Sequence, residues 1–258
     1  MESRSMRRIR LTEPPQANGT VRFASSEAHY AARVLRLRVG DEVAAFDGRG
    51  GEWHVRLVEV APGRVEGELL SAVAQTDAPP LPFILGQALP NKSSKMDWIV
   101  EKGSELGLTT LAPLYTERTV VREAPGRTET KLLRWKRIAE AAARQCGRSL
   151  LLDIHPPQSF GNFCAAYQTA PTKIMCWEGE SNRGIRDVLE ASRLAGPVAV
   201  LVGPEGGWTA QEVSQAHAHG FVTASLGPRI LRTETAAITL VSLIRYAQGE
   251  LSPLGQHG

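Results

Sequence analysis

A short apolar run ending in a glycine-rich loop stands at residues 198–208, which read VAVLVGPEGGW. A second junction of the same kind lies at residues 221–236, which read FVTASLGPRILRTETA. In open parallel α/β sheets, ligands bind beyond the carboxyl ends of the strands, and glycine there lets a ligand approach the backbone. Two such loops in adjacent strand–helix units therefore predict a ligand site, although each alone is also typical of an ordinary turn.

Outward from these loops, strands and helices alternate from residue 83 onward. The expected strands are 83–89, 109–115, 150–155, 173–177, 198–202 and 221–226. The expected helices are 95–106, 130–146, 160–167, 185–193, 210–219 and 234–248. This rhythm predicts an α/β fold with a parallel sheet that is covered by helices on both faces. Thr209 and Glu212 fit a capping box at the start of the helix at 210–219.

The first 75 residues follow a different pattern, with short strands that are rich in β-branched residues. Strands are expected at 42–47, 52–60 and 64–73, and one helix at 26–37. Such a set predicts a small β-barrel, a fold that often binds nucleic acid. Residues 76–82 read TDAPPLP, and prolines at this density indicate a linker. The expected domains are therefore a small β-barrel at 1–75, a linker at 76–82 and an α/β domain at 83–258, and the fold of the barrel does not by itself establish RNA binding.

The net charge of +3 is unevenly distributed along the 258 residues. Residues 81–150 contain 12 basic and 7 acidic side chains, whereas residues 151–258 contain 7 basic and 9 acidic ones. A basic stretch in the middle of the chain fits an acidic partner such as RNA. Solvated helix faces explain the same excess about equally well.

Several functional classes are excluded or disfavoured by the sequence. The longest apolar run, at 198–202, is too short to span a membrane, and the charged start of the chain argues against a secretory signal. The three cysteines are scattered, which indicates no disulfide framework, no metal site and a reducing cytoplasm. The chain has no P-loop, GxGxxG, GxSxG or HExxH motif, so a conventional kinase, hydrolase or metalloenzyme is disfavoured.

The two glycine loops carry a family resemblance when they are read together. Their motifs are Gly203-Pro204-Glu205-Gly206-Gly207 and Leu226-Gly227-x-x-Ile230-Leu231-Arg232-x-Glu234-Thr235-Ala236. They resemble the C-terminal half of the knotted, SPOUT-class methyltransferases. From Met6 to Gln248 the chain is similar to the bacterial 16S ribosomal RNA uridine-N3 methyltransferases. The other matching segments are 7–8, 39–43, 47–48, 95–102, 105–107, 117–118 and 134–135.

Two residues depart from the family pattern, and the start of the chain is longer. Arg144 stands where the family usually has an acidic residue, and Cys146 stands where it has a small hydroxyl residue. Five residues precede Met6, which the resemblance favours as the initiator. The departures concern the end of one helix and leave both glycine loops intact.

The resemblance implies a C-terminal trefoil-knotted α/β methyltransferase domain and an N-terminal PUA-like or OB-like β-barrel. It also implies that S-adenosylmethionine binds among the two loops, with its adenine against Leu226, Ile230 and Leu231. The full cofactor-binding set that it implies is Leu201, Gly203, Glu205, Gly206, Leu226, Gly227, Ile230, Leu231, Arg232, Thr233 and Ala236.

The implied reaction is methylation of N3 of a uridine in 16S ribosomal RNA, on the small subunit or its precursor. Because N3–H must lose its proton, Arg232 is expected to stabilise the developing charge, and Glu234 or Glu205 to accept the proton. A salt bridge at a helix N-terminus is the alternative interpretation of Arg232 and Glu234. Two other functions stay open: a knotted enzyme that methylates a ribose hydroxyl or a guanine, and an inactive RNA-binding relative.

RNA contacts are expected from basic side chains, and a homodimer from the last helix. The expected RNA-binding residues are Arg7, Arg8, Lys92, Lys95, Arg118, Arg122 and Arg134. The side chains of Trp53, Trp98 and Trp135 could stack bases, but buried packing is favoured for each. The helix at 234–248 is apolar over more than one face, which together with the resemblance predicts a two-fold interface.

Overall fold

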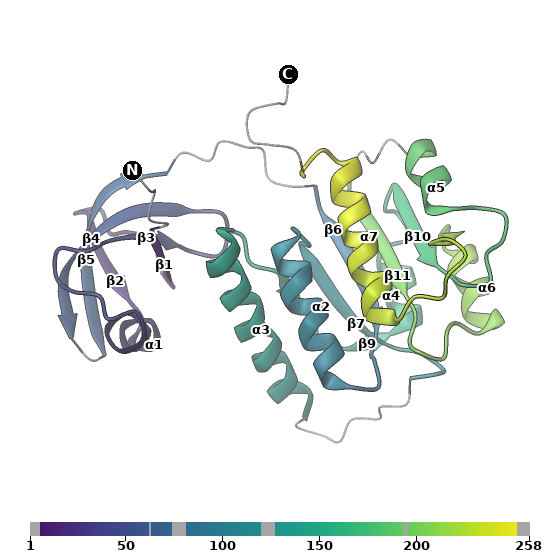
Figure 1. The fold of residues 1–258 in the computed structure, drawn as a ribbon, viewed down its shortest axis with the longest axis horizontal. Coiled ribbons are helices and arrows are strands. Elements are labelled where there is room, and N and C mark those ends of the chain that lie inside the picture. Colours follow the sequence, from purple (N-terminus) through teal and green to yellow (C-terminus); the bar gives the residue numbers. More distant parts are fainter. Residues whose placement is uncertain are drawn as a thin grey trace. The chain divides into compact units, whose positions relative to one another are not determined.

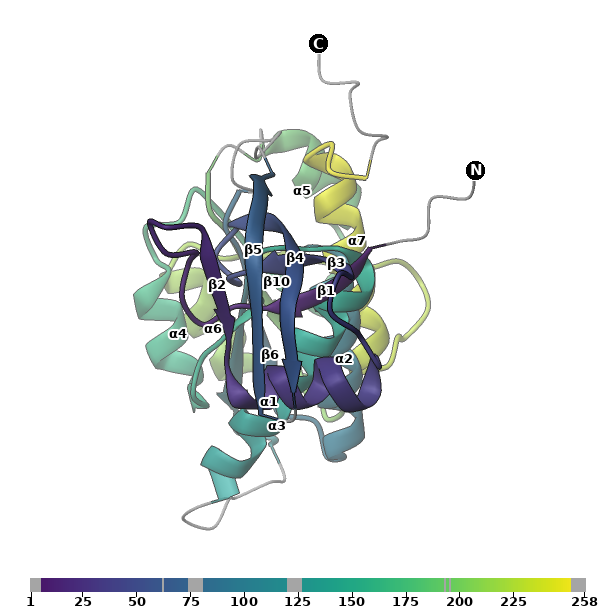
Figure 2. The same ribbon diagram turned by 90° about the vertical axis from the view of Figure 1, so that its left-hand side faces the viewer.

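The computed structural model of this chain describes residues 6–61, 63–73, 81–119, 127–192, 194 and 196–251. The chain forms two compact units, Met1–Pro79 with Ala143–Leu151 and Pro80–Ala142 with Leu152–Gly258. Figures 1 and 2 show the elements of each unit from two directions. Of the linker expected at 76–82, residues 76–80 lie outside the described part of the chain.

The smaller unit is built on one five-stranded sheet. Its elements are β1 (Arg7–Arg10), β2 (Thr20–Phe23), α1 (Ser25–His29), the π-helical turn η1 (Tyr30–Val34), β3 (Glu42–Phe46), β4 (Glu52–Ala61) and β5 (Arg64–Ala72). The strand order is β1-β3-β4-β5-β2, with β1 and β3 parallel and the other pairs antiparallel. In the described residues β1 and β2 are the two ends of this sheet, so a closed barrel stays a prediction.

The core of the smaller unit follows the two-residue period of its strands. Val43 and Ala45 of β3 and Val55 and Leu57 of β4 are buried in one apolar cluster, together with Ala28 of α1. The helix expected at 26–37 is found as α1 followed by η1, and it ends at Val34. Arg36 has a φ of 53°, the left-handed conformation that often follows the end of a helix.

The segment Ala143–Leu151 packs with the smaller unit, although the sequence pattern assigns it to the α/β domain. Leu150 forms isolated β-bridges with Gly48 and Arg49. The N–H of Gly50 donates to the carbonyl of Ser149 at 3.0 Å. These pairings involve residues about 100 positions apart, so no local pattern in the sequence indicates them.

Arg144, which departs from the family pattern, has an acidic partner here. Its Nη2 lies 2.7 Å from Oε1 of Glu27, and its guanidinium lies 4.7 Å from the ring centroid of Tyr30. Glu27 is 8% exposed and also accepts a hydrogen bond from the backbone N–H of Arg10 at 3.3 Å. Because the buried carboxylate is paired, the departure is accommodated by an ion pair within the unit.

The larger unit is a parallel α/β sheet, which confirms the predicted fold class. Its elements are β6 (Phe83–Ala88), α2 (Ser93–Glu105), β7 (Thr110–Tyr115), α3 (Arg127–Cys146), β8 (Asp153–Ile154), β9 (Gln158–Ser159), α4 (Phe160–Ala166), β10 (Thr172–Cys176), α5 (Ile185–Ala191), β11 (Val198–Val202), α6 (Ala210–Ala218), β12 (Val222–Ala224) and α7 (Thr233–Ala247). The strand order is β12-β10-β11-β6-β7-β8, with β9 paired to β7 and every pair parallel. The last residues of α3 pack with the smaller unit.

Helices cover both faces of this sheet. Val198, Val200 and Val202 of β11 pack in the apolar cluster formed with α2, α3, α5 and α7. The alternate residues Ala199 and Leu201 pack in the cluster formed with α4 and α6. In Figure 1, α2 and α7 lie in front of the sheet. Since all the strands are parallel, their carboxyl ends meet at one edge, which brings the loops after β10, β11 and β12 together.

The local signals at β11 and α6 agree with the structure. The strand spans Val198–Val202 as predicted. At the start of α6, the N–H of Glu212 donates to Thr209 Oγ1 at 3.2 Å, and the N–H of Thr209 donates to the Glu212 carboxylate at 2.9 Å, so the capping box is confirmed. The strand expected at 150–155 is reduced to the two residues of β8, and the two residues of β9 were not predicted.

Candidate functional site

A pocket of about 850 Å³ lies at the carboxyl ends of β10, β11 and β12. Three segments line it: 176–184 after β10, 202–207 after β11, and 225–233 between β12 and α7, with Ala236 of α7. Its size falls within the range of about 300–1,000 Å³ that small-molecule and cofactor sites occupy. The site therefore stands at the edge of the sheet where the sequence predicts a ligand.

The structure brings together all but one of the residues predicted to bind the cofactor. Those that line the pocket are Gly203, Glu205, Gly206, Leu226, Gly227, Ile230, Leu231, Arg232, Thr233 and Ala236. Leu201 does not line the pocket. Its side chain is 0% exposed and packs in the buried cluster formed with α4 and α6. Ile230 is 89% exposed, so an isolated apolar side chain stands open at the pocket.

The segment 177–184 is a third wall that the sequence analysis missed. Its carboxylate Glu180 accepts hydrogen bonds from Thr223 Oγ1 at 2.5 Å and from the N–H of Asn182 at 2.8 Å. These bonds, that from Thr223 first, lower the pKa of Glu180 from its ordinary value. The sequence does contain a signal for this wall, because a polar run with two glycines directly follows the strand at 173–177. The rule that ligands bind beyond the carboxyl ends of strands predicts the other two loops and applies here as well.

The two glycines that begin the predicted loops have different reasons to be glycine. Gly227 has a φ of 102°, which other residues adopt at a cost, and a Cβ there would meet open space. A Cβ on Gly203 would lie 3.1 Å from the indole of Trp208, whose Nε1 donates to the carbonyl of Cys176 at 2.9 Å. Packing against Trp208 within the loop therefore favours glycine at position 203.

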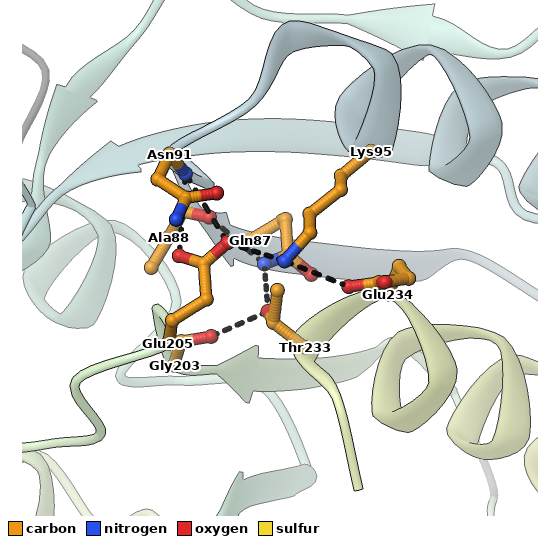
Figure 3. Close-up of polar contacts among 8 residues, drawn as sticks. All are labelled: Gln87, Ala88, Asn91, Lys95, Gly203, Glu205, Thr233 and Glu234. Atoms are coloured by element: carbon orange, nitrogen blue, oxygen red, sulfur yellow. Dashed lines mark hydrogen bonds and ion pairs between the residues drawn. The ribbon is translucent and has the colours of Figure 1, made fainter.

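A chain of hydrogen bonds connects β6, the loop after β11 and the start of α7 (Figure 3). The amide Nε2 of the fully buried Gln87 donates to Thr233 Oγ1 at 2.9 Å and to the carbonyl of Ala88 at 2.8 Å. Thr233 Oγ1 in turn donates to the carbonyl of Gly203 at 2.6 Å. Two walls of the pocket are therefore held to each other and to a central strand of the sheet.

Lys95 lies between two carboxylates beside this chain of hydrogen bonds. Its Nζ is 2.7 Å from Oε1 of Glu205 and 3.5 Å from Oε2 of Glu234 (Figure 3). The backbone N–H of Asn91 donates to both oxygens of Glu205 at 3.2 Å. Burial acts to raise the pKa of Glu205, but the hydrogen bonds from Lys95 and the backbone outweigh it, so that pKa is lowered. The hydrogen bond to Glu205 raises the pKa of Lys95. The pair is therefore ionised at neutral pH.

The two residues proposed for catalysis lie in different surroundings. Arg232 is exposed and lines the pocket. Glu234, in the first turn of α7, has a side chain that is 16% exposed, lies beside Lys95 and does not line the pocket. Glu205, the other candidate carboxylate, does line it. Arg232 and Glu205 thus line the same pocket, whereas Glu234 lies outside it and contacts Lys95.

The expected RNA-binding residues of the smaller unit differ in exposure. Arg7 is exposed on β1. Arg8 is 12% exposed and forms a bidentate ion pair with Glu52, with Nη1–Oε1 and Nη2–Oε2 distances of 2.8 Å and 3.0 Å. Its Nη2 also donates to Ser149 Oγ at 2.8 Å. The guanidinium of Arg8 therefore has a structural role within the unit.

The expected RNA-binding residues of the larger unit also differ in their surroundings. Lys92 is exposed before α2. Arg118 Nη1 donates to the carbonyl of Gly206 at 2.6 Å, at the pocket wall. Arg134 forms an ion pair of 2.8 Å with Asp97, and its side chain is 64% exposed. Lys95 is occupied by its two carboxylates, and Arg122 lies outside the described residues.

The burial of the three tryptophans agrees with the prediction only in part. Trp135 is 2% exposed, which fits buried packing, and Trp53 is half-buried. Trp98 is 42% exposed on α2, so the expectation of buried packing is wrong for this residue. The helical period places Trp98 away from Ile99 and Val100, which are buried against the sheet.

Two further features of the described residues bear on the class of site. In the part of the chain that the structure describes, no group of three or more His, Cys, Asp or Glu side chains is arranged to hold a metal ion. Within the same residues, no helix has the length and apolar character needed to cross a membrane.

Two family models match this chain, one on each unit. A model described as an RNA methyltransferase domain matches residues 77–245. A model described as an RNA methyltransferase PUA domain matches residues 24–70. The first covers the three loops of the pocket and the helices around them.

Individual proteins are similar over nearly the whole chain. The ribosomal RNA small subunit methyltransferase E of Synechocystis sp. is 37% identical over 238 residues, which are 91% of this chain and 76% of that protein. The protein of the same name from Bacillus subtilis is 30% identical, over 88% of this chain and 90% of that one. Among solved structures, the ribosomal RNA small subunit methyltransferase E of Neisseria gonorrhoeae bound to S-adenosyl methionine has a TM-score of 0.82 and 31% identity, over 93% of this chain and 97% of that one.

Proposed function

This chain belongs to the RNA methyltransferase family whose model spans residues 77–245, and from this premise we propose that it methylates N3 of a uridine in 16S ribosomal RNA. S-adenosylmethionine is the methyl donor, and the small ribosomal subunit or its precursor is the substrate. The observation that carries the proposal is the pocket formed by the glycine loops, on a chain whose relatives are named small-subunit ribosomal RNA methyltransferases. The cytoplasm is the compartment in which this substrate is found.

The residues of the pocket fit S-adenosylmethionine. The exposed side chain of Ile230, with Leu226 and Leu231, offers apolar surface to the adenine ring. Gly203, Gly206 and Gly227 have no side chain of their own, so a ligand can approach their backbone closely. The carbonyls of Gly203 and Gly206 accept hydrogen bonds from Thr233 and Arg118, which hold the loop in place. When bound, S-adenosylmethionine supplies an activated methyl group, so the protein mainly has to align the donor and the acceptor.

The charged residues of the pocket match the needs of the acceptor. N3 of uracil must lose its proton as it is methylated, and the charge then spreads onto O2 and O4. Arg232 is one of three arginines that line the pocket, with Arg183 and Arg229, and it would stabilise this charge. Glu205 is ionised and lines the same pocket, so of the two candidate carboxylates it is better placed to accept the proton. Glu234 would support Glu205 indirectly, through Lys95.

The position of the target atom restricts the RNA substrate. N3 lies on the Watson–Crick edge, so the target uridine must be unpaired or flipped out of its helix. Exposed basic side chains such as Lys92 and Arg134 would hold the phosphates around it. The PUA-matching residues 24–70 would supply a second RNA contact.

The same proposal includes a trefoil knot and a homodimer, both implied by the resemblance to knotted methyltransferases. The outer side of α7 is consistent with an interface to a second copy of the chain. Its side chains Ile238 and Leu243 are only partly buried, and Tyr246 is 73% exposed. An apolar helix side that its own unit leaves uncovered is typical of a subunit interface.

The test is transfer of labelled methyl from S-adenosylmethionine to small ribosomal subunits that lack the modification, with mass mapping of the product. The expected product is a single methyl group on N3 of a uridine. A methyl group on a ribose oxygen or a guanine would support the alternative target. Cofactor binding without transfer to any RNA would indicate an inactive relative.

A further inference from the structure

A second cavity, of about 240 Å³, lies at the same edge of the larger unit. Its walls come from the loop after β6, the first turns of α2 and the first half of α3. It is smaller than the 300–1,000 Å³ that is typical of whole ligands and cofactors. The cavity therefore suits a single planar ring rather than a second cofactor.

The cavity adjoins the S-adenosylmethionine pocket. Asn91 lines the second cavity, and its backbone N–H donates to both carboxylate oxygens of Glu205, which lines the first (Figure 3). The strands behind the two cavities, β6 and β11, are neighbours in the sheet, with Gln87 opposite Val202. A methyl acceptor has to come within about 3–3.5 Å of the donor, so an acceptor site is expected to border the donor site as this cavity does.

The lining of the cavity matches the chemistry of a pyrimidine base. The buried side chains of Met96 and Trp135 form an apolar floor. Asn91, Ser93 and Lys131, whose side chains carry an amide, a hydroxyl and an ammonium group, also line it. Uracil has two carbonyl oxygens that accept hydrogen bonds and two flat apolar faces, and such a base is read by polar groups at its edge and by apolar or aromatic contact with its ring.

We propose that this cavity receives the target uracil after it leaves its helix, an inference that rests on the proposed function. Lys92 adjoins the lining residues Asn91 and Ser93, and Arg134 adjoins Trp135. Both basic side chains are exposed, and they would contact the phosphates on either side of a flipped nucleotide. The first turns of α2 and the first half of α3 thereby become the base-binding part of the enzyme.

Two substitutions at one position test the cavity. Ser93→Phe fills it with a ring, whereas Ser93→Ala removes the hydroxyl and leaves the space open. We expect Ser93→Phe to lower kcat for methyl transfer by about 100-fold, the size of effect that a small misplacement of a reactant produces. Ser93→Ala should retain most of the activity. Both variants should bind S-adenosylmethionine like the parent in calorimetry, because Ser93 does not line the first pocket. Full activity of Ser93→Phe would overturn the assignment.

A charge-matched pair separates base binding from general attraction to RNA. Lys131→Ala and Lys136→Ala remove the same charge from α3, but only Lys131 lines the cavity. Lys131→Ala should raise KM for the RNA more than Lys136→Ala does, with circular dichroism unchanged in both. Equal effects of the two variants would count against the pocket.

Photocrosslinking tests the site without relying on turnover. A single-stranded oligoribonucleotide with one 4-thiouridine is irradiated with the full chain, and the crosslinked peptides are identified by mass spectrometry. The expected crosslinks lie within residues 89–96 or 131–135 and are lost in Ser93→Phe. Crosslinks confined to other peptides, or none, would overturn the inference even if the enzyme transfers methyl groups. Crosslinks at these residues without methyl transfer would instead refute the proposed function and leave a base-binding site.

Discussion

The hydroxyl of Thr233 donates a 2.6 Å hydrogen bond to the carbonyl oxygen of Gly203. Through this bond the first residue of α7 holds the loop after β11, and both residues line the cofactor pocket. Thr233→Val keeps the shape of the side chain but removes this bond and the one from Gln87. We expect the free energy of unfolding to fall by about 1–3 kcal/mol, as measured by urea denaturation. Cofactor affinity, as measured by calorimetry, should fall as well.

Thr235→Val is the matched control for that change, because Thr235 is exposed on the same helix. Thr235→Val should leave the free energy of unfolding and the cofactor affinity close to those of the parent. If Thr233→Val behaves like Thr235→Val, the hydrogen bond does not hold the pocket together.

The ion pair between Lys95 and Glu205 predicts a particular dependence of stability on pH. Because the pKa of Glu205 is lowered, its contribution is present above the ordinary value of 4.5 and is lost as the pH falls through the folded-state pKa. Because the pKa of Lys95 is raised, its contribution is present below the ordinary value of 10.5 and is lost as the pH rises through the folded-state pKa. Lys95→Met removes this ion pair. The free energy of unfolding of the variant should therefore fall less than that of the parent at both acid and alkaline pH, as measured by a series of denaturation curves.

Lys92→Met serves as the control in the same series, since Lys92 is exposed on the loop just before α2. Its profile should follow that of the parent. An unchanged acid limb in Lys95→Met would mean that the Asn91 backbone alone holds the Glu205 carboxylate.

Substitutions at the two loop glycines should separate packing from ligand contact. Gly203→Val introduces side-chain atoms against Trp208, so it should destabilise the fold by about 1–3 kcal/mol, as overpacking does. Gly227→Ala meets no neighbouring atom but forces a φ of 102° on alanine, which costs about 1–2 kcal/mol. Thermal unfolding and calorimetry on both variants check this. A Gly203→Val chain as stable as the parent would show that the loop can move away from Trp208.

The two kinds of basic residue should respond differently to salt. Lys92→Ala removes an exposed charge, so the slope of log affinity for RNA against log salt should flatten by about 0.7–0.9. Arg8→Ala should leave that slope alone and lower stability by about 1–3 kcal/mol, because Glu52 loses a charged hydrogen-bond partner. Filter binding at several salt concentrations, with urea denaturation, measures both. A flatter slope for Arg8→Ala would return that residue to the RNA interface.

The proposed homodimer can be tested on the uncovered side of α7. Tyr246→Glu and Leu243→Glu place charges there, whereas Val58→Glu places one on an exposed site of β4 in the smaller unit. Light scattering of the parent should give twice the chain mass of 28.0 kDa, and only the α7 variants should approach the single-chain mass. A parent that scatters as one chain and still transfers methyl groups would refute the dimer.

The sequence was most informative where one element determines its own structure. The apolar run of β11 and the capping pair Thr209 and Glu212 were predicted as found, because each depends on neighbouring residues alone. The loops after β11 and β12 were found from glycines at strand ends. The third wall at 177–184 has weaker glycine spacing, and only the sheet order shows that β10 lies between β11 and β12.

Properties that depend on distant residues could not be predicted. Lys95 was expected to contact RNA because it is basic, but its partner Glu205 is 110 positions away. The partners of Arg8 were equally hidden in the sequence, since Glu52 and Ser149 hold it from other elements, and its contact with RNA stays a prediction. The segment Ala143–Leu151 continues a helix of the larger unit, and only its contacts with Gly48 and Glu27 show that it packs elsewhere.

The hydrogen bond between Gln87 and Thr233 has a consequence for how the protein is made. It spans 146 positions and joins the first strand of the larger unit to its last helix. Contacts of such long sequence separation form late in folding, because a large loop must close first. During synthesis, Thr233 is added 146 positions after Gln87, so the proposed cofactor site stays incomplete until α7 has been made. The site is therefore among the last parts of the larger unit to be completed.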